Sequence, residues 1–184
     1  MTTGLLLLDS CTVINVFATR RMSDVLKMVP GTVAIVDRVS RESQFVRRAG
    51  SGDDADERDP VDLTAMTASG QLTVLSSTNE GELLTYLDFT LDVDDGEAMT
   101  AALAIHRNAT VATDDRKAIR LLVARAVPIL STQDLVHDWC DRTNLPRDEQ
   151  RQALLNIRER ARYEPRLDHP HRSWWEATIG AGDR

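Results

Sequence analysis

The chain opens with a short apolar run that stops at an acid, Leu5-Leu6-Leu7-Leu8 followed by Asp9. An unbroken apolar run of this length is typical of a parallel strand that is buried on both faces of a sheet. Asp9 would then stand at the carboxyl end of the strand, the edge where open α/β sheets place their sites. Taken alone, Asp9 could equally be the N-cap of a following helix, so the rest of the chain must decide.

Similar short apolar runs recur along the chain, at 33–36, 72–75, 110–113 and 127–130. Between them lie stretches with the apolar spacing of helices, at 12–17, 24–29, 37–48, 61–69, 80–89, 94–105, 116–126 and 133–140. Strands that alternate with helices in this way predict an α/β fold, in which a central parallel sheet is flanked by helices and the crossovers are right-handed.

Two parts of the chain depart from this alternation. Residues 49–60 combine glycines with a run of acids and a closing proline, which predicts a mobile, solvated loop. Residues 147–162 form a highly charged amphipathic helix, and the polar tail after them carries Trp174 and Trp175, which we expect to dock on a protein surface. The expected parts are a domain over 1–142 and a C-terminal helical extension over 143–184.

The composition restricts the function and the location. A net charge of -7 argues against a passive polyanion binder, because such binders need a surplus of Lys and Arg. It does not exclude a nuclease, since acids around bound metal ions are locally neutralised. The apolar runs are too short for a membrane span or a secretory signal, so we expect a cytoplasmic protein without membrane contact. Cys11 and Cys140 form no zinc pattern and are expected to be reduced.

Acidic residues follow the predicted strands or lie in the predicted helices beyond them. The carboxyl ends of parallel strands share one edge of the sheet with the first turns of the next helices, so these acids can gather in one cleft. Clustered carboxylates repel one another unless they are protonated or hold a hard cation, and oxygen ligands suit Mg²⁺ or Mn²⁺. Such ions activate water for attack on a phosphodiester. The acids concerned are Asp9, Glu42, Glu97, Asp114 and Asp115.

Each acid also has a simpler explanation. Glu42 could pair with a neighbouring arginine, and Glu97 could be a first-turn acid that suits the helix dipole. Asp114 or Asp115 could be a helix N-cap. The order and spacing of the acids along the chain, rather than any single position, indicate a shared site.

Four motifs carry a resemblance to a known family. They are Leu5–Asn15 with the first acid, Val39-Ser40-Arg41-Glu42-Ser43, Asp95-Gly96-Glu97-Ala98, and Thr113-Asp114-Asp115-Arg116. In this order they resemble the PIN-domain ribonucleases, the family that includes the VapC-like toxins of bacterial toxin–antitoxin pairs. The third motif is the Gly-Glu-Ala variant, in which Glu97 takes the place of an aspartate. The resemblance covers roughly residues 4 to 138 and leaves out the tail.

The resemblance implies a PIN-like three-layer α/β fold and a metal-dependent endoribonuclease that hydrolyses RNA with one or two Mg²⁺ or Mn²⁺ ions. It also implies RNA as substrate, an antitoxin protein as partner, and a homodimer. The residues expected to act in catalysis are Asp9, Glu42, Glu97 and Asp115, and those expected at the metal are Asp9, Glu97, Asp114 and Asp115. The residues expected to hold phosphates are Arg41, Arg116 and Lys117, and those expected to support the site are Ser10, Thr12 and Thr113.

One position departs from the family pattern. Cys11 stands where family members usually have Ser, Thr or Asn, and a thiol is a poorer hydrogen-bond partner than a hydroxyl. This predicts weakened activity, or a substitute role for Ser10 or Thr12. One alternative is therefore a PIN fold with a decayed site that acts as a binding or regulatory module. Another is a receiver-like domain phosphorylated on Asp9, which explains Glu42 poorly.

Overall fold

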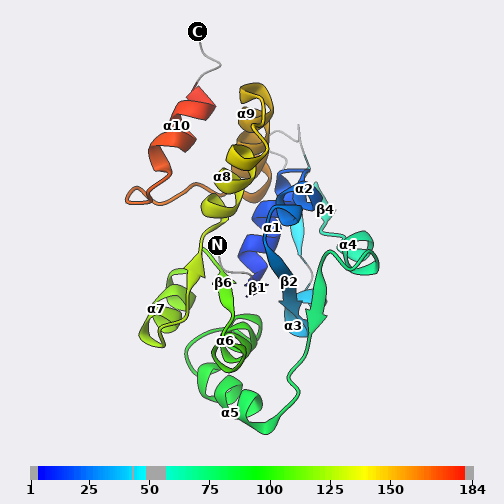
Figure 1. Cartoon of the computed structure of the whole chain (residues 1–184), viewed down its shortest axis with the longest axis vertical. Helices are drawn as coiled ribbons and strands as arrows, with labels where there is room; N and C mark the ends of the chain where they lie inside the picture. The colour runs from blue at the N-terminus through cyan, green and yellow to red at the C-terminus, as the bar shows by residue number, and fades with distance from the viewer. Residues whose placement is uncertain (1–3, 43, 49–56, 181–184) are drawn as a thin grey trace. The chain divides into compact units, whose positions relative to one another are not determined.

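The computed structural model describes residues 4–42, 44–48 and 57–180 (Figure 1). The chain forms two compact units, each assembled from separate segments of the sequence. Unit 1 comprises residues 1–13, 29–43 and 62–132, and unit 2 comprises residues 14–28, 44–61 and 133–184. The boundary predicted at residue 142 divides the chain into two continuous domains, and it stays a prediction.

A five-stranded parallel sheet forms the centre of unit 1, with strand order β5-β2-β1-β6-β7 (Figure 1). All five strands fall at or within one to two residues of the apolar runs that predict them. Their bounds are β1 (Gly4–Leu8), β2 (Gly31–Val36), β5 (Thr73–Leu75), β6 (Thr110–Ala112) and β7 (Ile129–Leu130). Because β1 is the central strand, Leu6, Leu7 and Leu8 are buried.

Helices flank this sheet and complete the core of unit 1. Helix α6 (Asp95–Arg107) packs against β1, β2 and β6 through small residues such as Ala98 and Ala102, which allow close approach to the strands. Helix α5 (Glu80–Phe89) packs against α6. The remaining helices of unit 1 are α3 (Asp37–Arg41), α4 (Thr64–Ala68) and α7 (Arg116–Ala124). The predicted fold class, a parallel α/β sheet flanked by helices, is confirmed.

The strand order reverses between β1 and β6. From β1 the chain adds β2 and then β5 on one side, and it then returns to add β6 and β7 on the other side. Open α/β sheets bind ligands beyond the carboxyl ends of the strands at such a switch point. The backbone N–H of Asp9 donates to the Ala112 carbonyl across this point at 3.0 Å, so Asp9 and Thr113 follow directly from the two strands.

Unit 2 is mainly helical and has its own core. Helix α1 (Ser10–Ala18) begins in unit 1 and ends in unit 2. The predicted C-terminal helical extension is present, with α9 continuing into a single π-helical stretch, η1. The other elements are α2 (Met22–Lys27), β3 (Phe45–Arg47), β4 (Arg58–Pro60), α8 (Thr132–Arg142), α9 (Arg147–Asn156), η1 (Ile157–Ala161) and α10 (Arg172–Gly180).

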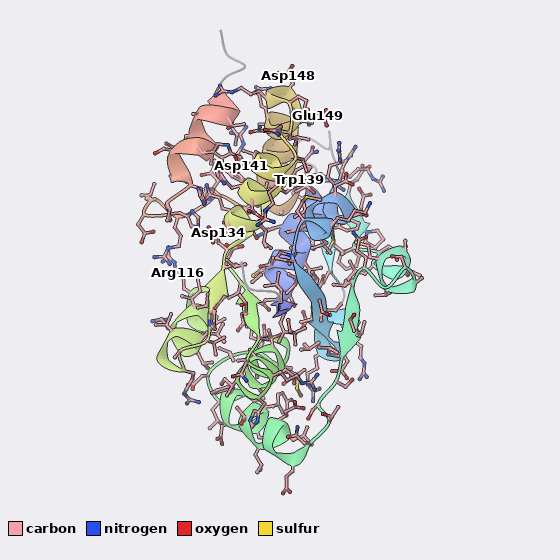
Figure 2. All side chains as sticks on the ribbon, viewed as in Figure 1. Arg116, Asp134, Trp139, Asp141, Asp148 and Glu149 are labelled. Carbon is pink, nitrogen blue, oxygen red and sulfur yellow. The ribbon has the colours of Figure 1, made fainter. Side chains whose placement is uncertain are left out.

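Two large side chains illustrate the packing of unit 2. Trp139 on α8 is 1% exposed, and the Arg21 guanidinium lies 5.7 Å from its ring centroid. Arg21 also forms an ion pair at 3.0 Å with Glu149 near the start of α9 (Figure 2). Trp175 on α10 is buried, and its ring meets Tyr163 edge-on. The expectation that the tail tryptophans dock on protein is therefore met within unit 2.

Two predictions on secondary structure are wrong in part. The helix expected over 37–48 ends at Arg41, because Glu42 adopts an extended backbone and residues 45–47 pair antiparallel with 58–60 as β3 and β4. The last part of the loop expected over 49–60 is thus a strand, and residues 49–56 lie outside the described residues. The tail after Pro165, for which no helix or strand is predicted from the sequence, contains α10.

Two further expectations concern the membrane and the cysteines. In the described part of the chain, no helix is long and apolar enough to cross a membrane. Cys11 and Cys140 are free thiols, as predicted.

Candidate functional site

Asp9 is the centre of the candidate site in unit 1. It is 2% exposed, and burial is the main cause that raises the pKa of its carboxyl group. Three neutral donors oppose this effect by stabilising the anion: the Thr113 hydroxyl at 2.8 Å, the Cys11 thiol at 3.3 Å and the Ser10 backbone N–H at 2.7 Å. The carboxylate is therefore fixed in position by hydrogen bonds rather than by a cationic side chain.

Cys11 takes the place that a hydroxyl residue was expected to occupy. Its Sγ donates to Asp9 Oδ2, and it also accepts the backbone N–H of Asp114 at 3.4 Å. Burial, followed by the charge of Asp9, raises the pKa of the Cys11 thiol to about 12. The group thus stays protonated at neutral pH and keeps its role as a donor to the carboxylate.

Glu42 reaches the same site from the end of α3. The Ser10 hydroxyl donates to Glu42 Oε2, which joins the start of α1 to the end of α3 within unit 1. Glu42 Oε1 lies against Gly96 in the first turn of α6, where a Cβ atom would collide with it. Glycine at position 96 is therefore the residue that leaves room for the Glu42 carboxylate.

Glu97 follows Gly96 and is half-buried. Its backbone N–H donates to Asp94 Oδ1 at 2.8 Å, so Asp94 is the N-cap of α6. Burial, and then the charges of Asp9, Asp94 and Asp115, raise the pKa of Glu97 to about 7. The like charges of these three carboxylates disfavour the ionised form of Glu97.

The two adjacent acids after β6 have different surroundings. Asp115 is the N-cap of α7, since its Oδ1 accepts the backbone N–H groups of Lys117 at 2.6 Å and Ala118 at 3.0 Å. Asp114 instead accepts from the hydroxyl and backbone N–H of Thr132 at the start of α8. Asp115 therefore belongs, with Asp9, Glu42 and Glu97, to what we call the acidic cluster. Asp114 instead connects the end of β6 to Thr132.

The other predicted site residues are placed around this cluster. Thr12 is fully buried, and its hydroxyl donates to the Ala112 carbonyl at 2.9 Å, which holds the start of α1 against β6. Arg116 and Lys117 are exposed in the first turn of α7, where Arg116 is labelled in Figure 2. Arg41 is exposed and forms an ion pair with Asp37 at 3.1 Å. Among the residues that the structure describes, no arginine or lysine forms a hydrogen bond or ion pair with the buried carboxylate of Asp9.

We tested whether these residues suit a divalent cation. Asp9, Glu42, Glu97 and Asp115 offer carboxylate oxygens, the donors that Mg²⁺ and Mn²⁺ prefer. Within the described ranges, none of the four forms an ion pair with a basic side chain. In the same ranges, no group of three or more His, Cys, Asp or Glu side chains is arranged to hold a metal ion. The donor chemistry and the uncompensated charge fit a hard cation, which would have to draw the carboxylates together.

Sequence reasoning missed three residues that shape this site. Asp94 adds its negative charge to those of Asp9 and Asp115 near Glu97, Gly96 makes room for Glu42, and Thr132 holds Asp114. A sequence signal existed for Asp94, because an aspartate three residues before Glu97 has the spacing of an N-cap and its N3 residue. No comparable local signal marks Thr132, which lies 18 residues from Asp114 along the chain.

Comparison with known proteins gives no assignment. No family model matches the chain, and no match is found among curated proteins or solved structures.

Proposed function

We propose that this chain is a metal-dependent ribonuclease of the PIN type, which hydrolyses RNA phosphodiester bonds at the acidic cluster of unit 1. The observation that carries the proposal is the convergence of Asp9, Glu42, Glu97 and Asp115 at the carboxyl edge of a parallel sheet, with no basic side chain paired to any of them in the described chain. Asp9 is buried, Glu97 and Asp115 are half-buried and Glu42 is exposed, and the repulsion between such like charges is relieved by a cationic ligand.

The residues divide into ligands and positioning groups. Asp9, Glu97 and Asp115 would hold Mg²⁺ or Mn²⁺, with Glu42 beside them. When bound, such an ion lowers the pKa of a water and neutralises charge on the phosphodiester oxygens. Thr113 and Cys11 position the Asp9 carboxylate through their hydrogen bonds.

Three other groups complete the proposed division of roles. Ser10 orients Glu42 through its hydroxyl. Arg116 and Lys117 are exposed after Asp115, where they can meet the phosphates of a substrate. An antitoxin partner and a homodimer belong to this proposal through the resemblance to VapC-like toxins alone.

The direct test is cleavage of a labelled RNA pool with Mn²⁺ or Mg²⁺. Asp9→Asn and Asp115→Asn should each lower the rate by at least about a hundredfold, because each removes a charged oxygen ligand while keeping the side-chain shape. Asp88→Asn is the matched control, since Asp88 is exposed on α5 of the same unit. Cleavage that is equal in all three variants and the wild type would refute the assignment of the site.

A second candidate is a PIN-type fold that binds without catalysis. The observation that favours it is the absence of a formed metal-holding group among the described residues. Thermal unfolding with and without Mn²⁺ separates the two candidates. A ligand at 100 times its dissociation constant stabilises the folded state by about 2.7 kcal/mol, so the ribonuclease should show a rise in Tm that Asp9→Asn abolishes. No rise in the wild type would favour the binding module.

A further inference from the structure

Unit 2 contains a groove that is lined by arginines rather than by acids. It lies between the β3–β4 hairpin and η1, has a volume of about 300 Å³, and includes Arg47, Arg58, Arg160 and Arg162 in its lining. All of these residues belong to unit 2. The whole chain carries a net charge of -7, so this gathering of positive charge is a local feature.

Two of the arginines face each other across the hairpin. Arg47 on β3 is directly opposite Arg58 on β4 in the antiparallel register. Like charges directly opposite one another destabilise a strand pair. Within the described part of the chain, neither arginine forms an ion pair. The hairpin therefore keeps an arrangement that costs stability and that a bound anion would relieve.

The described acids of the same hairpin, Glu57 and Asp59, form ion pairs with other arginines. Asp59 accepts from Arg48 at 3.1 Å and from Arg160 at 3.3 Å, and Glu57 pairs with Arg48 at 3.3 Å. Among the described residues, these contacts leave Arg47 and Arg58 without an ion-paired acid.

The floor of the groove is rigidly built. Arg160 is 6% exposed, and its guanidinium donates to the carbonyl groups of Arg47 at 3.1 Å and Ala18 at 3.2 Å. Arg162, which ends η1, adopts a left-handed backbone with φ of 55°. Glycine or asparagine usually takes this position at a helix end. Arg162 occupies this position although arginine does not favour the left-handed backbone, and it lines the groove.

An exposed aromatic ring lies next to these charges. Phe45 and Arg47 alternate with the buried Val46 on β3, so both point to the groove side of the strand. Phe45 is 44% exposed. A basic groove with an exposed aromatic ring is the combination that binds single-stranded nucleic acid, because arginines contact phosphates and the ring stacks on an unpaired base.

We propose that this groove binds single-stranded RNA, with Arg47, Arg58 and Arg162 on the phosphate backbone and Phe45 stacked on a base. The choice of RNA rests on the proposed function, whereas the phosphate chemistry rests on the groove alone. The surface is distinct from the acidic cluster, since it lies entirely within unit 2.

Binding is measured on the full chain by fluorescence anisotropy with a labelled single-stranded RNA 12-mer, in EDTA so that no metal-dependent cleavage occurs. Arg47→Gln/Arg58→Gln should weaken binding at least tenfold. It should also reduce the slope of log K against log salt by about 1.4, since each phosphate contact on a single strand contributes about 0.7. The control Arg147→Gln/Arg166→Gln removes two exposed arginines of unit 2 outside the groove lining and should change affinity less than twofold.

Phe45→Leu tests the stacking separately. It should weaken binding about tenfold and leave the salt slope unchanged, because stacking releases no counterions. The Tm of Arg47→Gln/Arg58→Gln should be at least that of the wild type, since the repulsion across the hairpin is removed.

Two results would overturn the proposal. One is an equal loss of affinity in the groove variant and the Arg147/Arg166 control. The other is binding of an RNA duplex as tight as that of the single strand, with no effect of Phe45→Leu. Binding in EDTA reports on the groove and cleavage with Mn²⁺ reports on the acidic cluster, so a failed groove and a failed catalytic site give different results.

Discussion

Gly96 shows how one missing methyl group sets the geometry of the candidate site. The Glu42 carboxylate occupies the space that a Cβ atom at position 96 would fill. A second glycine, Gly81, has the same place in α5: each is the second residue of its helix and each precedes a glutamate. A Cβ atom at position 81, however, would meet no acid of the site: its nearest neighbours would be the His106 ring at 3.1 Å and Asn79 Oδ1 at 3.3 Å. Gly81 is therefore a matched control for the effect of a substitution at Gly96.

Gly96→Ala should displace Glu42 and lower RNA cleavage by about tenfold or more, because a misplaced catalytic group is costly to the rate. Stability should change little, since alanine favours the helix by up to about 1 kcal/mol over glycine and this offsets the local crowding. Gly81→Ala makes the same change away from the acidic cluster and should leave cleavage within twofold of the wild type. Both are checked by cleavage rates and by Tm. Full activity in Gly96→Ala would show that Glu42 has no role.

At the scale of elements, α5 and α6 begin in the same way and differ in their chemistry. Asn79-Glu80-Gly81-Glu82 and Asp94-Asp95-Gly96-Glu97 each start a helix with a capping residue whose side chain accepts from the glutamate N–H. Glu82 is 2% exposed and pairs with Arg107 at 2.8 Å, at the far end of α6. Glu97 has no such partner among the described residues. At the start of α5 the glutamate is held by an ion pair, whereas at the start of α6 the glutamate is available for a ligand.

The Glu82–Arg107 pair makes stability depend on pH. Hydrogen bonds from Arg107 lower the pKa of Glu82 from 4.5 to about 2. A lowered pKa in the folded state stabilises the protein above the unfolded pKa, and this contribution is lost as the pH falls from 4.5 toward 2. Glu82→Gln should therefore cost about 2 kcal/mol at pH 7, and its deficit relative to the wild type should shrink across that window.

Urea unfolding at several pH values between 7 and 2.5 measures this difference. Glu80→Gln serves as the control, because Glu80 is exposed on the same helix and forms no ion pair in the described chain. Its unfolding free energy should follow the wild type at every pH. A deficit of Glu82→Gln that is constant with pH would show that the ion pair does not carry the effect.

The sequence predicted much of unit 1, because its signals are local. The apolar runs identify the five strands, and their order brings Asp9 and Asp115 to one edge. Other features depend on contacts between distant residues. The different roles of Asp114 and Asp115 depend on the hydrogen bond between Asp114 and Thr132. The short strands β3 and β4 are defined by their pairing with each other, which the acid-rich sequence between them does not indicate. The sequence alone also cannot show that Glu82 is ion-paired and Glu97 is not, since this difference depends on the position of Arg107 in the fold.

At the scale of the whole molecule, the two compact units are interleaved along the chain. The path passes from one unit to the other after residues 13, 28, 43, 61 and 132. The core of unit 2 combines late residues, such as Leu154 and Ile157, with residues near the N-terminus. Arg160, for example, donates to the Ala18 carbonyl, 142 residues away along the chain.

Truncation to residues 1–142 tests whether the boundary predicted from the sequence marks an independent domain. It removes Leu154, Ile157 and Trp175, which are at most 2% exposed, so we expect exposed apolar surface and a loss of cooperative unfolding. Binding of a hydrophobic dye and urea unfolding measure both effects, with a chain of residues 1–180 as the control. A truncated chain that unfolds at the wild-type urea midpoint would support the boundary at residue 142.

The interleaved path also limits how such a protein can change by recombination. A single crossover between two related genes anywhere between residues 14 and 131 exchanges pieces of both units, because each unit is encoded in separate segments. Such a crossover divides at least one of the two surfaces, the acidic cluster or the arginine-lined groove, between the two parent genes. Recombination therefore disrupts one surface or the other, whereas point substitutions can change each surface separately.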